Sequence, residues 1–268
     1  MKVAVNNNSP VLFIDSGIGG IPYCCHFLEK NPGQNIIYLA DREHFPYGAR
    51  KRKELAGISI KLAEQAINKF NPKIIVLACN TASLAALSEL REKFPFLPFV
   101  GTVPAIKPAV LAAKTGKIGV LGTELTVNEP YIKELAAQYG SCEIIGIAAP
   151  ELVEFVEKCF FFTSAEEKQT TVRSYIERFI AAGADAIVLG CTHFLLLLEE
   201  FHKEAAGCIS IFESISGISQ RLESLLDYSL PAQRVPHRLV ITGKAEPESM
   251  WLNWAERLGF RLSLMDKV

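Results

Sequence analysis

Short apolar runs rich in β-branched residues alternate with longer segments in which apolar residues recur every three or four positions. The longer segments, such as residues 51–70, have the spacing of one helical face. The short runs predict strands at residues 11–14, 35–39, 73–78, 117–121, 143–148, 186–189, 209–212 and 239–242. Several of these strands are apolar without interruption, which predicts burial on both faces. The pattern therefore predicts an α/β fold with doubly wound, mainly parallel sheets.

Helix stop signals separate these elements. Asn, Pro or Gly residues at 31–33, 71–72, 139–140 and 182–183 predict helix ends, and a last helix is predicted over 247–258.

Two parts of the chain resemble each other. Residues 74–81 and 186–193 are each an apolar strand that ends on a cysteine, Cys79 or Cys191, and continues into polar residues. Upstream, residues 12–17 and 119–123 also match, with Ser16 opposite Thr123. We therefore expect two lobes that share one α/β arrangement of strands and helices. Residues 1–100 and 214–268 form the first lobe, to which the tail strand returns, and residues 101–213 form the second.

Charge and apolar runs limit the class of protein. The chain has 28 Lys and Arg against 29 Asp and Glu, so a net charge of −1 gives no basic surface for nucleic acid or an anionic membrane. The N-terminus has no signal-peptide pattern, and the longest apolar segments, 74–88 and 186–198, are too short to span a bilayer. Seven cysteines without regular spacing favour reduced thiols. We expect a soluble cytoplasmic protein.

Candidate chemistry gathers where strands end. In open α/β sheets the ligand binds outside the carboxyl ends of the strands. The polar residues at these predicted ends are Asp15, Ser16, Asp41, Cys79, Asn80, Thr81, Thr123, Cys191, Thr192 and His193. Helix N-termini after the two cysteines favour thiolate and bind carboxylates. Small polar residues also cap helices and buried cysteines are often inert, but two cysteines at equivalent strand ends favour the chemical interpretation. The loop 43–48 is expected to cover this site.

Other motifs are given less weight. The turn at 17–20 resembles a dinucleotide fingerprint, but Pro22 stands where its third glycine belongs. Zinc binding by Cys79, Cys191 and His193 lacks paired-ligand spacing. No metal is therefore predicted. His44 is expected in a loop without a special role. No lysine for a pyridoxal-type Schiff base stands at a strand end, and no cofactor is predicted.

Several stretches together resemble the cofactor-independent aspartate/glutamate racemases. They are residues 13–20, Phe45-Pro46-Tyr47-Gly48, residues 78–83, residues 101–109, Gly190-Cys191-Thr192-His193-Phe194, and the late segments 241–243 and 254–259. They occur in family order and cover nearly the whole chain.

The resemblance implies two lobes related by a pseudo-twofold axis, with glutamate bound in the cleft between them and interconverted between its L and D forms. It also implies a supply of D-glutamate for peptidoglycan and a homodimer. By position, Cys79 and Cys191 are the acid/base pair, and Glu157 assists the second cysteine. The other substrate-contacting or supporting residues are Asp15, Ser16, Tyr47, Gly48, Asn80, Thr81, Thr123, Thr192 and His193. Glu213, before Ser214, departs from the usual Asp.

Racemisation needs proton removal from one face of the α-carbon and delivery to the other, hence two groups on opposite sides. Thiols suit both tasks, because a pKa of about 8.5 lets one be thiolate and the other thiol. Asp15 and His193 are expected to orient the thiols. The resemblance implies that Cys79 takes the proton from D-glutamate and that Cys191 takes it from L-glutamate.

Three alternatives remain. The closest is an aspartate racemase or a related two-cysteine racemase, although His193 and the loop at 45–48 favour glutamate. From another class, the chain is a thiol redox or metal-binding protein. The third is a binding or regulatory protein that has kept the fold.

Overall fold

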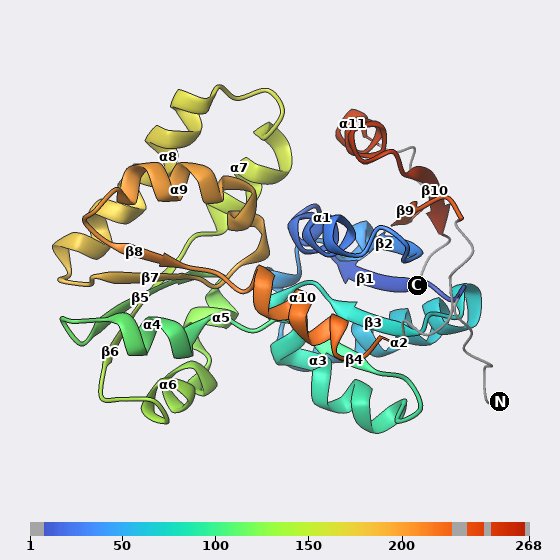
Figure 1. The fold of residues 1–268 in the computed structure, drawn as a ribbon, viewed down its shortest axis with the longest axis horizontal. Coiled ribbons are helices and arrows are strands. Elements are labelled where there is room, and N and C mark those ends of the chain that lie inside the picture. Colours follow the sequence, from blue (N-terminus) through green and yellow to red (C-terminus); the bar gives the residue numbers. More distant parts are fainter. Residues whose placement is uncertain (1–7, 227–234, 244–247, 266–268) are drawn as a thin grey trace. The chain divides into compact units, whose positions relative to one another are not determined.

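Ten strands in two parallel sheets form the framework of the described residues, which are 8–226, 235–243 and 248–265 of this computed structural model (Figure 1). The first sheet has the order β10-β9-β2-β1-β3-β4 and the second has the order β6-β5-β7-β8. Their bounds are β1 Val11–Asp15, β2 Ile36–Ala40, β3 Ile74–Leu77, β4 Phe99–Gly101, β5 Lys117–Gly122, β6 Glu143–Ala148, β7 Ala186–Leu189, β8 Ser210–Phe212, β9 Arg238–Thr242 and β10 Arg261–Met265. All paired strands are parallel.

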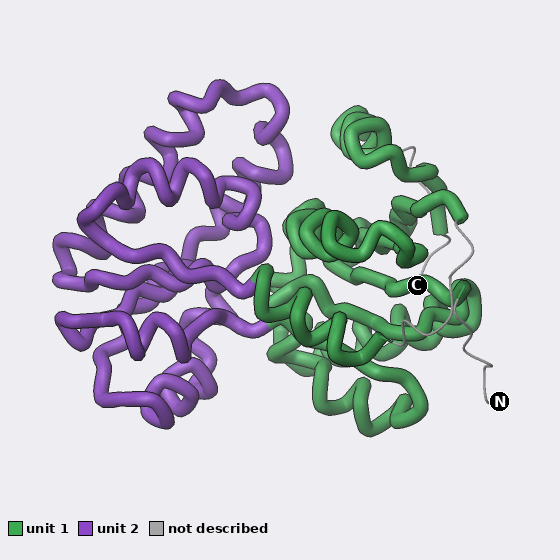
Figure 2. The backbone as a smooth tube through the Cα atoms, viewed as in Figure 1, with its two compact units in different colours: residues 1–102, 215–268 green, residues 103–214 purple. Residues whose placement is uncertain are grey.

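The chain divides into two compact units (Figure 2). Unit 1 comprises residues 1–102 and 215–268, and unit 2 comprises residues 103–214. Unit 1 holds the first sheet with α1 Ile21–Lys30, α2 Arg52–Phe70, α3 Asn80–Lys93, α10 Ile215–Glu223, α11 Ser249–Leu258 and the short 3₁₀ helices η1 Arg42–His44 and η2 Tyr47–Ala49. Unit 2 holds the second sheet with α4 Ile106–Ala112, α5 Glu124–Asn128, α6 Pro130–Ala137, α7 Pro150–Cys159, α8 Ala165–Ala181, α9 Leu198–Ala205 and the 3₁₀ helix η3 Thr192–Leu197.

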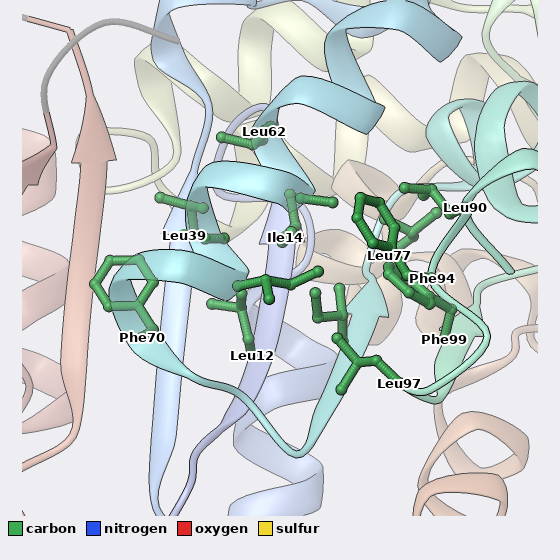
Figure 3. Packing of buried hydrophobic residues seen from close by; sticks show 14 of the residues in the cluster. Leu12, Ile14, Leu39, Leu62, Phe70, Leu77, Leu90, Phe94, Leu97 and Phe99 are labelled. Atoms are coloured by element: carbon green, nitrogen blue, oxygen red, sulfur yellow. The ribbon is translucent and has the colours of Figure 1, made fainter. Parts of the chain in front are cut away.

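The core of unit 1 explains why its central strands read as uninterrupted apolar runs. Every residue of β1, β2 and β3 is buried. On one face of the sheet, Leu12 and Leu77 pack with Leu62 of α2 and Leu90 of α3 (Figure 3). Burial of this apolar surface, at about 25 cal/mol per Å², is the main term that stabilises the sheet. The α/β class predicted from the pattern is confirmed.

Three local features differ from the prediction. The strands β4 and β10 were not predicted: β4 has only three residues in a Pro-rich stretch, and β10 is a half-exposed edge strand with mixed residues. Cys191 is followed by the 3₁₀ helix η3, and the α-helix α9 starts only at Leu198. Such 3₁₀ turns are common at the N-termini of α-helices. The predicted start of the last helix, Pro247, lies outside the described residues.

Glycine at position 20 permits close packing beneath the first cysteine. A Cβ atom there would lie 2.7 Å from Ala78 Cβ and 2.9 Å from the Ala78 carbonyl oxygen. Both distances are too short for unbonded atoms, and one partner is backbone. The start of α1 therefore rests directly on the chain that leads into Cys79.

We predict that Gly20→Ala lowers the free energy of unfolding by about 1–3 kcal/mol, because the added methyl group overpacks this contact. Gly57→Ala is the matched control: it lies in α2 with no atom within 4 Å of the new Cβ, so it should raise stability by roughly 0.5–1 kcal/mol. Urea unfolding followed by circular dichroism measures both changes. A Gly20→Ala variant as stable as the wild type would contradict the packing described.

Candidate active site

Cys79 is placed by the parallel ladder of unit 1. The backbone N–H of Ala78 donates to the carbonyl of Ile14 at 2.8 Å, which continues the β1–β3 pairing beyond the last residue of β3. The next residue, Cys79, therefore stands at the same sheet edge as Asp15, the end of β1. Cys79 is 7% exposed and is the N-cap of α3.

Cys191 occupies the equivalent place in unit 2. There the N–H of Gly190 donates to the carbonyl of Leu121 at 2.7 Å, next to the end of β5. Cys191 is 5% exposed and precedes η3. Four strands of unit 1, β2-β1-β3-β4, have the same order along the chain as β6-β5-β7-β8 of unit 2. The internal sequence match thus corresponds to one strand arrangement used twice.

In unit 2, Cys191, His193 and Glu157 form a buried hydrogen-bonded chain. His193 Nδ1 lies 3.8 Å from Cys191 Sγ, and His193 Nε2 lies 2.8 Å from Glu157 Oε1. Burial by itself would lower the pKa of His193, but the hydrogen bonds and charges of Cys191 and Glu157 outweigh it and hold the pKa well above the ordinary value. The imidazole therefore retains its second proton beside the sulfur.

In unit 1, the carboxylate of Asp41 joins three donors. Tyr47 Oη donates to Asp41 Oδ2 at 2.7 Å, and Thr242 Oγ1 donates to Oδ1 at 2.7 Å. His44 Nδ1 lies 2.9 Å from Oδ2. His44 lies in the loop, as expected, and the loop folds back over the end of β2 so that the ring contacts this buried carboxylate, a contact that the sequence did not predict.

Tyr47 is a protonated donor in this setting. Burial, followed by the charge and hydrogen bond of Asp41, raises the pKa of Tyr47 well above its ordinary value. Cys79 and Asp15 act on it in the same direction, which places the phenol in the electrostatic neighbourhood of the first thiol. Tyr47 also packs with Cys79 in one apolar cluster. Gly48 follows it in η2 and is partly exposed.

The remaining unit 1 candidates lie at the same edge. Asp15 is fully buried and accepts hydrogen bonds from the N–H of Gly17 at 3.1 Å and from Ser16 Oγ at 3.4 Å. Thr81 is buried in the first turn of α3. Asn80 is 2% exposed, and neither the nitrogen nor the oxygen of its side-chain amide has a hydrogen-bond partner in the described structure. Such an amide is costly to bury unless a ligand or water pairs with it.

The two threonine candidates of unit 2 begin helices. Thr123 Oγ1 accepts from the N–H of Thr126 at 3.3 Å and caps α5. Thr192 is buried at the start of η3, next to Cys191. Both lie at the carboxyl ends of strands, as predicted, although the Thr123 hydroxyl already has a partner within the protein.

The candidates thus form two groups, one in each unit. Unit 1 contributes Asp15, Ser16, Tyr47, Gly48, Cys79, Asn80 and Thr81, and unit 2 contributes Thr123, Glu157, Cys191, Thr192 and His193. Sequence reasoning gave no role to Thr242 or His44 and noted Asp41 only as a strand end. The available signal was that Asp41 and Thr242 each follow or end an apolar strand, but the pairing of β2 with β9 was needed to join them.

The described residues contain no disulfide bond, and all seven cysteines are free thiols. Within 8–226, 235–243 and 248–265, no group of three or more His, Cys, Asp or Glu side chains is arranged to hold a metal ion. A cavity of about 540 Å³ lined by Asn35, Phe70, Arg238 and Arg261 lies in unit 1 at the amino ends of the strands, whereas Cys79 follows the carboxyl end of β3. No helix in the described part of the chain is long and apolar enough to cross a membrane.

Comparison with known proteins gives consistent results. Residues 28–215 match the family model for Asp/Glu/Hydantoin racemase. Glutamate racemase of Roseiflexus is 37% identical over 81% of this chain and 79% of its own length. Glutamate racemase of Sphingopyxis alaskensis is 36% identical over 89% of this chain and 90% of its own length.

Solved structures extend the likeness to the fold. The crystal structure of Escherichia coli glutamate racemase, in complex with L-glutamate and the activator UDP-MurNAc-Ala, has a TM-score of 0.83 and 29% identity. The match covers 97% of this chain and 98% of that chain. A glutamate racemase isoform from Bacillus anthracis has a TM-score of 0.78 and 27% identity over 98% of each chain. The chain belongs to the Asp/Glu/Hydantoin racemase family.

Proposed function

We propose that this chain is a glutamate racemase in which Cys79 and Cys191 exchange protons with the α-carbon of glutamate. The observation that carries the proposal is the equivalent placement of the two cysteines, each one step beyond a parallel strand and each in a unit of the same strand order. Two relatives more than 35% identical over most of the chain are glutamate racemases, which supports the choice of substrate.

The reaction needs one thiolate and one thiol at a time. The thiolate removes the α-proton from one face, and the opposite thiol delivers its own proton to the other face. The charges of the two sulfurs are thereby exchanged, so each enantiomer meets the enzyme in the opposite protonation state. Cys191 as thiolate removes the proton from L-glutamate, and Cys79 as thiolate removes it from D-glutamate. This requires the substrate to present opposite faces of its α-carbon to the two sulfurs.

In unit 2, His193 and Glu157 are proposed to support Cys191. A protonated imidazole beside the sulfur favours the thiolate form by charge and by hydrogen bonding. Glu157 holds the ring in place through Nε2, so that Nδ1 faces the sulfur. The same imidazole can return a proton to the sulfur after the substrate leaves.

In unit 1, the polar edge is proposed to bind the substrate. The buried amide of Asn80 offers its nitrogen as a donor and its oxygen as an acceptor to the amino-acid head group, and the first N–H groups of α3 offer further donors. Ser16 and Thr81 are proposed contacts at the same edge. Asp15 is proposed to orient Cys79, while Tyr47 and Gly48 contact the substrate from the loop. Thr123 and Thr192 are proposed contacts from unit 2.

The α-proton of an amino acid is very weakly acidic, so the carbanion-like transition state must be stabilised. Fixed hydroxyl, amide and backbone donors around the substrate carboxylate supply this stabilisation without reorganisation. The proposal invokes no cofactor. It also includes a supply of D-glutamate for peptidoglycan, a cytoplasmic location and a homodimer, each resting on the family resemblance.

We predict that Cys79→Ser and Cys191→Ser each slow the racemisation of L-glutamate and D-glutamate by roughly 10²–10⁴-fold, because a hydroxyl is a far weaker acid than a thiol and is hardly ionised near neutral pH, so it neither donates the proton readily nor supplies the base. The control is Cys208→Ser, an exposed thiol of unit 2 that should keep the wild-type rate. Circular dichroism with α-proton NMR in D₂O measures the loss of optical activity and the entry of deuterium together.

Either serine variant with near wild-type turnover in both directions would refute the two-thiol mechanism. Wild-type protein that racemises L-aspartate but leaves L-glutamate unchanged would move the assignment to an aspartate racemase. Stoichiometric zinc in the purified protein, or a disulfide between Cys79 and Cys191, would support the metal or redox alternative.

We predict that Glu157→Gln lowers the pKa of His193, because it removes the carboxylate charge that helps to hold the imidazolium. A raised folded-state pKa stabilises the protein below the unfolded value of about 6.5, and this contribution disappears as the pH rises through the folded pKa. The stability loss of the variant should therefore be largest at acidic pH and fade as the pH is raised. NMR titration of the histidine rings and urea unfolding at several pH values measure the two effects.

The control is Glu154→Gln on the same helix, whose exposed carboxylate pairs with Lys158. It should leave the His193 signal unchanged. Identical titration of His193 in the wild type and in Glu157→Gln would show that the pair does not set the charge of the imidazole.

A further inference from the structure

Thr242 is a buried residue at the end of β9, contributed by the last part of the chain. Its hydroxyl donates to Asp41 Oδ1 at 2.7 Å and accepts from the N–H of Glu43 at 3.1 Å. The Thr242 side chain is thus hydrogen-bonded both to Asp41, directly after β2, and to Glu43 in the first turn of the loop that follows.

The Asp41 carboxylate transmits this contact to the substrate loop. Thr242 binds one carboxylate oxygen and Tyr47 binds the other, while His44 lies within 3.1 Å of both. Asp41 is fully buried, so a lost donor is not replaced by bulk water. The carboxylate is planar, so holding Oδ1 by the Thr242 hydroxyl also fixes the orientation of Oδ2. The direction in which Oδ2 accepts the hydrogen bond from Tyr47 is thereby fixed.

Arg42 makes a second contact between this loop and the last part of the chain. The guanidinium of Arg42 lies 4.3 Å from the ring centre of Phe45 and 5.8 Å from that of Trp251, and it pairs with Glu248 at 3.5 Å. The pair with Glu248 is more than half exposed on one side and adds little. The buried Thr242 contact is therefore the stronger polar contact between the last part of the chain and the loop.

We propose that Thr242 is a positioning residue that holds Tyr47 and Gly48 at the substrate site through the carboxylate of Asp41. The identity of the substrate in this inference rests on the proposed function, but the mechanical link does not. Because Tyr47 and Gly48 are assigned to substrate binding and not to proton transfer, a loosened loop weakens binding of the ground state and the transition state alike.

The test compares Thr242→Val, which removes the hydroxyl, with Thr242→Ser, which keeps it. We expect Thr242→Val to raise KM for L-glutamate and D-glutamate by roughly ten- to a hundredfold, the effect of losing one buried hydrogen bond to a charged group, with kcat changed less than about threefold. Thr242→Ser should restore KM to within about twofold of the wild type. The control is Ser263→Ala in β10. The Ser263 hydroxyl accepts a hydrogen bond from Arg238 and makes none with residues 42–50 in the described structure.

Hydrogen exchange of the ligand-free protein, followed by mass spectrometry, supplies a readout that does not depend on activity. Thr242→Val should speed exchange in peptides that cover residues 42–50 and leave α2 and the strands of unit 2 unchanged. If wild-type protein does not act on glutamate, the proposed function fails, and this exchange pattern alone then decides the positioning role.

Unchanged exchange over 42–50 would overturn the inference. So would faster exchange throughout unit 1, which marks general loosening, or a KM in Thr242→Ser as high as in Thr242→Val.

Discussion

Neighbouring parallel strands have their carboxyl ends at the same edge of a sheet, and the positions of both cysteines depend on this geometry. In each unit one backbone hydrogen bond beyond the last paired residue, from Ala78 or from Gly190, fixes where the following cysteine stands. The strands beneath are buried on both faces, so their register resists slipping. The two cysteines are thereby held at the ends of buried strands, and the loops and helix starts around them supply the polar groups.

The shared backbone plan does not extend to the side chains that accompany the thiols. Cys191 has an imidazole held by a buried carboxylate, whereas Cys79 lies near Asp15 and a protonated phenol. At the place where unit 1 has Asp41, after the strand that neighbours β1, unit 2 has Ala149. The repeated strand arrangement thus gives the two cysteines equivalent positions, while different charged and polar side chains surround each thiol.

Sequence patterns predicted what depends on local, repeated signals. The buried strands, the strand-end cysteines and the likeness of the two units follow from apolar runs and from residues that end them. The buried strand β4 has only three residues, too few for a recognisable pattern, and the edge strand β10 is half exposed without a regular alternation of apolar and polar residues. The bond between Asp41 and Thr242 depends on β9 lying beside β2, and strand order in a sheet is set by packing across the whole unit.

The discontinuity of unit 1 has a consequence for how the protein is made. Unit 2 is one uninterrupted segment, so all its strands are translated before β9. Asp41 and its donor Thr242 are 201 residues apart. At about 5–20 residues per second, roughly 10–40 seconds separate their synthesis. During that interval the edge of β2 that pairs with β9 is uncovered and the Asp41 carboxylate lacks one of its three donors, so the loop beside the first thiol acquires its final position only after β9 has been made.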